Sequence, residues 1–335
     1  MVHKFFLMVG NGFTLSYIDH CGININSSKP FDHQIDCPFS PKESLIDCLP
    51  ELKRLRASYE NETDFKFMKI FANNFMKDLP KYSKSKLKKI ISTGKWDKIS
   101  EYTKELENFH RPHCNLRQYL ALIYFDYSKK IASQWKPNWN WENWIKNHID
   151  DIVGVFDFNY DLTLEFVLSK LGIKYYRIST TEEKNGIGVP IFKPHGSCDF
   201  DVIGISIPPE KRLKNYIWYN DMNLFLKIVP NDECEIPRVE ADIIIPYEKN
   251  TNLGLRWVDS GYIKLGNLIK QTDSCVIAGI RYMNADRPEI NYCISRTQPN
   301  SMFYYISGKK NYELEKSIMK VSKNVHYLNY KDPKH

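Results

Sequence analysis

The second half of this 335-residue chain alternates short apolar runs with helical stretches, and this alternation limits its fold more than any other feature. Apolar runs of about four to eight residues bounded by turn residues are typical of buried strands. Strands separated by helices form a parallel sheet through right-handed crossovers, with helices on both faces. The strand candidates are the first ten residues and 152–156, 174–178, 190–194, 241–246, 274–279, 302–306 and 325–328, and the later helices are expected at about 257–270, 287–296 and 311–322. The sequence therefore predicts a doubly wound, Rossmann-like α/β fold.

Residues 25–149 have a different texture, with long polar and amphipathic stretches and few β-branched runs. Helices are predicted at roughly 42–57, 63–78, 85–109 and 114–134, with interruptions at Pro80, Gly94 and Pro112. We therefore expect one nucleotide-binding-type domain made of residues 1–24 plus 150–335. A helical insertion, residues 25–149, would separate its first and second strands.

Charge, cysteine spacing and hydropathy exclude several classes of protein. The 47 basic and 40 acidic residues give a net charge of +7, which is too small for the dense basic surface of a nucleic-acid-binding protein, so direct nucleic-acid binding is not expected. The eight cysteines are scattered without a C-x-x-C pair and are expected to be reduced thiols. No apolar run approaches the ~18 residues that span a bilayer, so we expect a cytoplasmic protein without a membrane contact.

Gly10-Asn11-Gly12-Phe13 follows the first predicted strand and is the first candidate site. Glycines let the backbone approach a pyrophosphate, and a following helix offers unpaired N–H groups. The segment lacks the third glycine of the dinucleotide-binding fingerprint. A plain strand-to-helix turn is therefore an equally good interpretation of this segment taken alone.

Two further candidate sites follow later strands, where doubly wound folds bind their ligands. Asn159 and Asp161 come directly after the strand at 152–156 and could contact a sugar hydroxyl, a water or a carboxamide, although both residue types are also common helix caps. His195 follows the strand at 190–194, with Gly196 and Ser197 behind it. Histidine suits a general base near neutral pH, and a structural histidine is the alternative.

Together these segments resemble the sirtuin superfamily, in which a G-A-G-type loop, a Q-N-x-D segment and an H-G pair build an NAD site. The pattern Asn159-Tyr160-Asp161-Leu162-Thr163-Leu164-Glu165 looks like the form used by a divergent prokaryotic sirtuin-like branch of antiphage defence effectors. The segment Ile277-Ala278-Gly279-Ile280-Arg281-Tyr282, followed by Asp286, is similar to a late strand-loop motif of that branch. The G-N-G-F start is also similar to related abortive-infection proteins.

Two departures from the sirtuin deacylases bear on activity. The paired C-x-x-C motifs of their zinc module are missing, and Phe158 stands where those enzymes have the glutamine of the Q-N pair. Both departures argue against a standard lysine deacylase, and neither prevents cleavage of NAD. No zinc and no resident cofactor are expected.

The resemblance implies an NAD glycohydrolase that takes NAD as its substrate and releases nicotinamide and ADP-ribose. Asn159 would hold the ribose hydroxyls or the attacking water, His195 would be the general base, and Asp161 would orient the nicotinamide amide. The remaining residues would line the substrate: Gly10, Asn11, Gly12 and Phe13 beside the pyrophosphate and ribose, Gly196 and Ser197 in the pocket, and Gly279 and Arg281 near the adenosine half.

An unrestrained NADase would poison its own cell, so we expect control by homo-oligomerisation or by a separate partner chain. The resemblance suggests an ATPase, an Argonaute-like protein or a nucleotide-sensing subunit as that partner. Two alternatives remain open: a catalytically silent module that binds NAD or ADP-ribose, and an ADP-ribosyltransferase or zinc-free deacylase.

Three other features are less informative about function. The tryptophans between Trp135 and Trp144 are expected to pack the insertion against the core, and the lysine-rich run at 81–89 is expected to be a solvated face. His110, His113 and Cys114 lie close in sequence, but a helix break at Pro112 would separate the two histidines. No metal site is therefore predicted.

Overall fold

A computed structural model of the chain describes residues 4–82, 89–94, 97–201, 226–238, 241–246 and 255–329. Its centre is a seven-stranded sheet in the order β12-β11-β10-β1-β4-β6-β5, in which every neighbouring pair is parallel. The strands are β1 (Phe5–Val9), β4 (Ile152–Asp157), β5 (Tyr175–Arg177), β6 (Val189–Phe192), β10 (Ser274–Ala278), β11 (Met302–Ser307) and β12 (Val325–Asn329). The predicted doubly wound α/β fold is confirmed.

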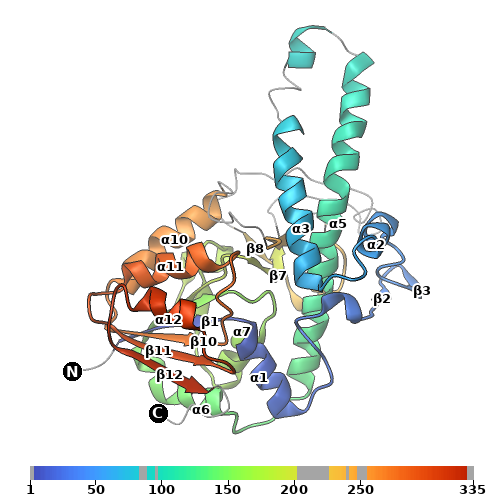
Figure 1. Cartoon of the computed structure of the whole chain (residues 1–335). Coiled ribbons are helices and arrows are strands. Elements are labelled where there is room, and N and C mark those ends of the chain that lie inside the picture. The colour runs from blue at the N-terminus through green and yellow to red at the C-terminus, as the bar shows by residue number, and fades with distance from the viewer. Residues whose placement is uncertain are drawn as a thin grey trace.

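Helices cover both faces of this sheet (Figure 1). One face carries α1 (Asn11–Cys21), α6 (Asn140–His148) and α7 (Thr163–Lys170), and the other carries α10 (Arg256–Ile269), α11 (Arg287–Arg296) and α12 (Tyr312–Ile318). Alternate side chains of β1 divide between the two cores, since Phe6 and Met8 enter one and Leu7 and Val9 enter the other. A strand buried on both faces explains why its sequence is continuously apolar.

The chain changes direction across the sheet between β1 and β10. Strand β4 follows on one side of β1, whereas β10 lies on its other side and leads outward to β11 and β12. A crevice forms at such a point because the two loops leave the sheet in opposite directions, and doubly wound proteins bind ligands there.

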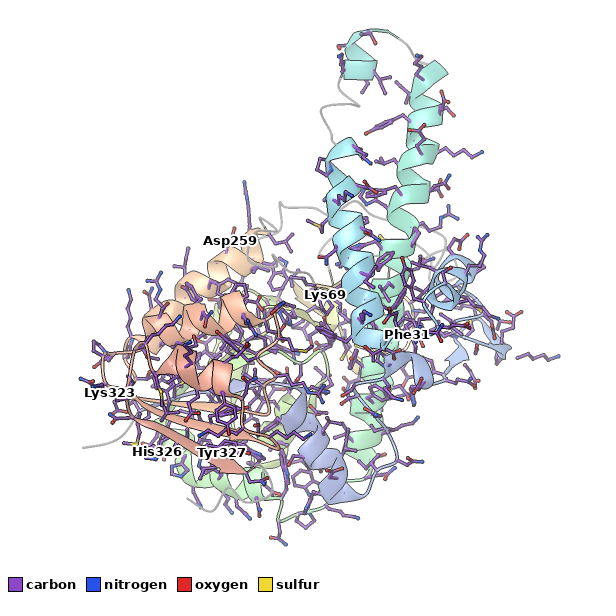
Figure 2. The ribbon with its side chains drawn as sticks, viewed as in Figure 1. Phe31, Lys69, Asp259, Lys323, His326 and Tyr327 are labelled. Atoms are coloured by element: carbon purple, nitrogen blue, oxygen red, sulfur yellow. The ribbon has the colours of Figure 1, made fainter. Side chains whose placement is uncertain are left out.

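The segment between α1 and β4 includes a two-helix hairpin that stands out from the body (Figure 1). Its elements are β2 (Asp36–Cys37), β3 (Ser40–Ser44), α2 (Pro50–Ala57), α3 (Asp64–Asp78) and α5 (Asp97–Ser133). At the base of the hairpin, Phe31 packs on Phe67 of α3 and on Tyr119 of α5 (Figure 2). Four short 3₁₀ helices, Pro30–Asp32, Leu79–Tyr82, Ile149–Asp151 and Thr181–Asn185, complete the connections.

Two helix boundaries predicted in this segment are wrong. Residues 42–57 are not one helix, because Ser40–Ser44 pairs with β2 as an antiparallel strand and the helix begins only at Pro50. Helix α5 runs through Pro112 without a break. A proline inside a helix costs about 3 kcal/mol, and buried packing on both sides offsets it, through Phe109 stacked on Phe75 and through Leu116 and Leu120 in the core.

The strand predicted at 241–246 is present, but it does not belong to the parallel sheet. Ala241–Ile243 forms β9, which pairs antiparallel with β7 (Gly196–Asp201) in a small sheet of order β8-β7-β9 and not with the parallel sheet. The remaining elements of this region are β8 (Lys227–Ile228) and the short helix α9 (Asn231–Cys234). Strand β7 starts directly after His195, so this small sheet borders the candidate site.

The tryptophan cluster packs as expected. Trp139 and Trp141 are buried with their rings against Phe13 of α1, and Trp144 lies in the same core. Of the lysine-rich run, residues 83–88 lie outside the described residues. The eight cysteines form no disulfide. None of the helices in the described residues is long and apolar enough to cross a membrane.

The turns after β1 and β10 touch so closely that Gly279→Ala should destabilise the protein strongly. Gly279 has φ +64°, and a Cβ there would lie 2.3 Å from the backbone nitrogen of Phe13. Left-handed strain of ~1–2 kcal/mol and overpacking of ~1–3 kcal/mol predict a loss of roughly 2–5 kcal/mol in urea unfolding.

Gly94 provides the matched control, because it has the same φ of +64° and a Cβ added there would have no neighbour within 4 Å. Gly94→Ala should cost only the strain of ~1–2 kcal/mol. Equal losses in the two variants would show that the contact between the two turns contributes nothing to stability.

Candidate functional site

The glycines of the first candidate segment lie at the crossing point of the sheet, against Gly279. The N–H of Gly10 donates to the carbonyl of Ala278 at 3.0 Å, and that of Gly12 donates to the carbonyl of Gly279 at 2.9 Å. A Cβ on Gly12 would stand 2.7 Å from the Cα of Gly279. Contact between the two turns therefore accounts for glycine at both positions. Helix α1 starts here with no side-chain cap and no acidic residue in its first turn, so no carboxylate offsets its positive dipole, although the N–H groups of Gly12 and Phe13 are already bonded to the carbonyls of Gly279 and Gly10.

Asn11 and Phe13, the other residues of this segment, point away from the crossing point. The amide of Asn11 donates to the hydroxyl of Ser28 and accepts a hydrogen bond from that of Ser27. The ring of Phe13 is buried against Trp139 and Trp141. The ring of Phe13 therefore faces the core, and its backbone N–H is bonded to the carbonyl of Gly10 at 2.8 Å, so this structure gives Phe13 no free group toward the predicted pyrophosphate and ribose.

The loop after β4 carries Asn159 and Asp161, which have different surroundings. Asp161 is buried, and its carboxylate accepts from the hydroxyl of Thr14 at 3.0–3.1 Å and from the N–H of Thr163 at 3.0 Å. It thereby ties α1 to the start of α7. Among the described residues the side-chain amide of Asn159 has no hydrogen-bond partner, although the residue is only 6% exposed. Of the two, Asn159 is the one with hydrogen-bonding capacity left for a ligand.

A buried lysine fixes the shape of this loop. The Nζ of Lys193 lies 2.9 Å from Asp157, 3.1 Å from Glu165 and 2.7 Å from the carbonyl of Asp161. Its three N–H donors thus meet three acceptors. Burial raises the pKa of Asp157 to about 7 despite the opposing charge of Lys193. The network joins the carboxyl ends of β4 and β6 and has a structural role.

His195 is held between aromatic rings and an acidic helix start. Its ring lies 5.4 Å from that of Phe158 and 6.4 Å from that of Tyr160, the two neighbours of Asn159 in the chain. Its Nε2 is 2.6 Å from Oε2 of Glu289 on α11. The other carboxylate oxygen of Glu289 accepts from the hydroxyl of Tyr262 on α10 at 2.7 Å.

This environment favours the charged form of His195. Burial lowers the pKa of the imidazole, but the charge and hydrogen bond of Glu289, the charge of Asp286 and the backbone of Phe158 outweigh burial and raise the pKa to about 9. A histidine with that pKa is protonated at neutral pH and cannot accept a proton. In this arrangement His195 is charged, so the role of general base that the sequence predicts requires the loss of its contact with Glu289.

Gly196 and Ser197 continue from His195 into β7. Gly196 has φ +80°, a conformation that favours glycine, and its N–H donates to the carbonyl of Lys193 at 3.0 Å. Ser197 is fully buried, with its hydroxyl 3.4 Å from the carbonyl of Tyr160. Gly196 thus makes the turn that places His195, and Ser197 joins that turn to the loop after β4.

Arg281 lies apart from His195, in a groove of about 610 Å³ beside α1. The groove is also lined by Leu15 and Ser28, and Ser28 is the residue that contacts Asn11. The exposed guanidinium of Arg281 has no hydrogen bond or ion pair among the described residues. The groove is within the size range of small-molecule sites, and it borders the turn that contains Gly279.

Ligand-type side chains converge at one place among the described residues, where atoms of His195, Asp286 and Glu289 lie within 4.8 Å of one another. The 2.6 Å hydrogen bond and the Tyr262 contact already account for this grouping, so we assign no metal to it. Pro112 does not separate His110 from His113, contrary to prediction. Both are buried on α5, and their rings contact that of Phe75.

Glu289, Tyr262 and the Lys193 network were not predicted from the sequence. An acid in the first turn of a helix commonly offsets the helix dipole, so Glu289 carried no distinctive signal, and Tyr262 is one of 21 tyrosines. Lys193 was detectable, because a lysine at the end of a buried strand needs an acidic partner and Asp157 ends the neighbouring strand.

A scan against family models finds no match for this chain, and a search among curated proteins finds none either. Any function assigned to the chain therefore rests on its motifs and on the geometry described above.

Lys193→Met tests the buried network. The substitution leaves the carboxylates of Asp157 and Glu165 without their cation, and breaking a buried ion pair costs ~3–5 kcal/mol. We expect that loss in the free energy of unfolding at pH 7, measured by urea denaturation. Lys129→Met removes an exposed 2.8 Å pair with Glu235 and should change stability by less than about 1 kcal/mol. A small effect at Lys193 would contradict the structural role.

Proposed function

We propose that this chain is an NAD glycohydrolase that cleaves the bond between nicotinamide and ribose. The observation that carries the proposal is that Asn159, a residue only 6% exposed whose side-chain amide has no partner among the described residues, and His195 follow β4 and β6 at the same edge of the parallel sheet as the glycine turns of β1 and β10. Ligands of doubly wound folds bind at that edge. The order of these segments also resembles the sirtuin-like pattern.

The pyrophosphate, a ribose and the adenosine half of NAD each have a chemically suitable neighbour at this edge. The positive end of α1, whose dipole no acidic residue offsets, suits a pyrophosphate. The amide of Asn159 suits a ribose hydroxyl or a water, since it can both donate and accept. The groove with Arg281 suits the adenosine half and its phosphate. Asp161 and Lys193 contribute by fixing the loop that carries Asn159.

Cleavage breaks the bond between C1′ of the ribose and the nicotinamide nitrogen, and the electron pair leaves with nicotinamide. Positive charge develops on the ribose, which oriented dipoles such as the Asn159 carbonyl stabilise. Water adds to C1′ and gives its proton to a base, for which His195 in its neutral form is the candidate. The products are nicotinamide and ADP-ribose.

The biological role is proposed from the sirtuin-like resemblance. An NADase of this branch would act in antiphage defence by depleting the NAD of an infected cell. If the enzyme requires activation by a partner chain or by homo-oligomerisation, it stays inactive in uninfected cells.

A silent NAD- or ADP-ribose-binding module is the second candidate, and one observation favours it. His195 is bonded to Glu289 and its ring packs against that of Phe158, which suits a histidine that shapes a pocket without exchanging protons.

The test is to incubate the purified protein with NAD, with and without the products of neighbouring genes, and to measure nicotinamide and ADP-ribose by chromatography. Asn159→Ala and His195→Ala should each lower product formation by at least about 100-fold, as expected for positioned polar and acid–base groups. Asn267→Ala on the exposed side of α10 and His326→Ala on β12 (Figure 2) are matched controls and should keep wild-type activity.

Three other outcomes would each change the assignment. Label from NAD on protein, or consumption of an acyl-lysine peptide, would indicate a transferase or deacylase. No product together with a rise in melting temperature on adding NAD would indicate the silent binding module. Neither product nor binding would refute the sirtuin-like interpretation.

A further inference from the structure

Glu289 reaches the candidate base from the opposite half of the sheet. His195 follows β6, whereas Glu289 lies in the first turn of α11, after β10. The His195 Nε2 to Glu289 Oε2 distance of 2.6 Å is short for a hydrogen bond between nitrogen and oxygen, as is typical when both groups are charged. This contact therefore links the two halves of the site.

The position of Glu289 is itself fixed. Its side chain is 1% exposed, and its second oxygen accepts from the Tyr262 hydroxyl. Tyr262 is in turn buried against Phe156 and Phe192 at the ends of β4 and β6. Glu289 consequently meets His195 in a single orientation.

The groups that face the His195 ring carry negative charge. The carboxylate of Glu289 lies 2.6 Å from Nε2, and atoms of His195, Glu289 and Asp286 all lie within 4.8 Å of one another. Opposite charges at such distances favour the charged form of an imidazole. The two carboxylates therefore select the imidazolium.

The other titratable groups around the His195 ring do not change its preference for the imidazolium form. Asp286 on the approach to α11 adds negative charge, and the hydroxyls of Tyr160 and Tyr262 donate hydrogen bonds, to the carbonyl of Ile244 and to Glu289, so they carry no charge. Cys293 lies farther along α11, and burial raises the pKa of its thiol well above the ordinary value, so it too is uncharged. Glu289 is the group in direct contact, and it dominates.

We propose that Glu289, braced by Tyr262, is a positioning residue that locks His195 in its proton-loaded form, so that the reaction requires the Glu289–His195 contact to open. This inference rests on the proposed NAD glycohydrolase function. Glu289 on α11 would thereby control His195, which follows β6 in the other half of the sheet.

The connection between β10 and α11 provides a physical route for that control. It begins with Gly279, which packs on Gly12, continues through Arg281 in the groove beside α1, and ends at Asp286 and Glu289. The same segment therefore borders the groove at Arg281 and holds His195 at Glu289.

The first test follows the protonation of His195 directly, without any need for activity. NMR spectra of protein with labelled histidine are recorded from pH 5 to 10.5, with His195→Gln to assign the signal among nine histidines. We expect His195 to titrate near pH 9 in the wild type and at or below the ordinary ~6.5 in Glu289→Gln, because burial then acts without a compensating charge. Gln has the shape of Glu, so the fold should persist.

Asp286→Asn is the second variant, in case the buried substitution disturbs folding. Asp286 is partly exposed and makes no hydrogen bond to His195, so its removal should lower the titration point by a smaller amount, about one unit. Glu313→Gln, an exposed glutamate paired with Arg287, is the matched control and should leave the titration unchanged.

The second test measures NAD cleavage against pH. A base with a pKa near 9 is neutral in about 1% of molecules at pH 7, so wild-type activity should rise with pH up to about 9. In Glu289→Gln the rise should occur at least two units lower, which makes the variant about tenfold or more faster than wild type at pH 6.5.

Each result either supports or overturns the lock. An unchanged His195 titration in Glu289→Gln overturns it, as does a loss of activity by the same factor at every pH. If His195 titrates as expected but no NAD is cleaved under any condition, the lock stands as a structural fact and the proposed function fails. The two failures are therefore distinguishable.

Discussion

The contact between the turns after β1 and β10 is the constraint on which the rest of the site depends. Because Gly12 and Gly279 have no side chains, the two backbones approach closely enough for the N–H of Gly12 to donate to the carbonyl of Gly279. That approach closes the crossing point of the sheet and sets where the chain leaves β10. The same chain then carries Glu289 across to His195. A bulkier turn at either position would separate the two halves of the site.

Buried charges organise the carboxyl edge of the sheet in two separate groups. Lys193 neutralises Asp157 and Glu165 and holds the loop after β4, whereas Glu289 and Asp286 surround His195. In the first group each N–H of the lysine has an acceptor. The second leaves Asn159 nearby with an unused amide. The residues around Lys193 therefore shape the loop, whereas Asn159 and His195 are available for chemistry. Asp161 belongs to the loop-shaping residues, although the sequence predicts a substrate contact for it.

Periodicity predicted the fold well, because strands buried on both faces are continuously apolar and amphipathic helices repeat every 3–4 residues. The helix at Pro112 was mispredicted because tertiary packing on either side of a proline is invisible to local rules. Asn159 and His195 were identified as candidates by their positions after strands. Their partners were not, since Glu289 is 94 residues from His195 and nothing local to α11 marks that pairing. Phe13 was placed beside the ligand because its packing against Trp139 joins two segments that are distant in the sequence, and local patterns do not indicate such a contact.

A crystal structure of the protein with ADP-ribose would show directly whether this edge of the sheet binds NAD beside Asn159 and His195. We expect the pyrophosphate at the start of α1 and the terminal ribose within hydrogen-bond distance of the Asn159 amide. We also expect a longer distance between His195 and Glu289 than 2.6 Å. ADP-ribose bound elsewhere, or absent at millimolar concentration, would show that this edge is not an NAD site.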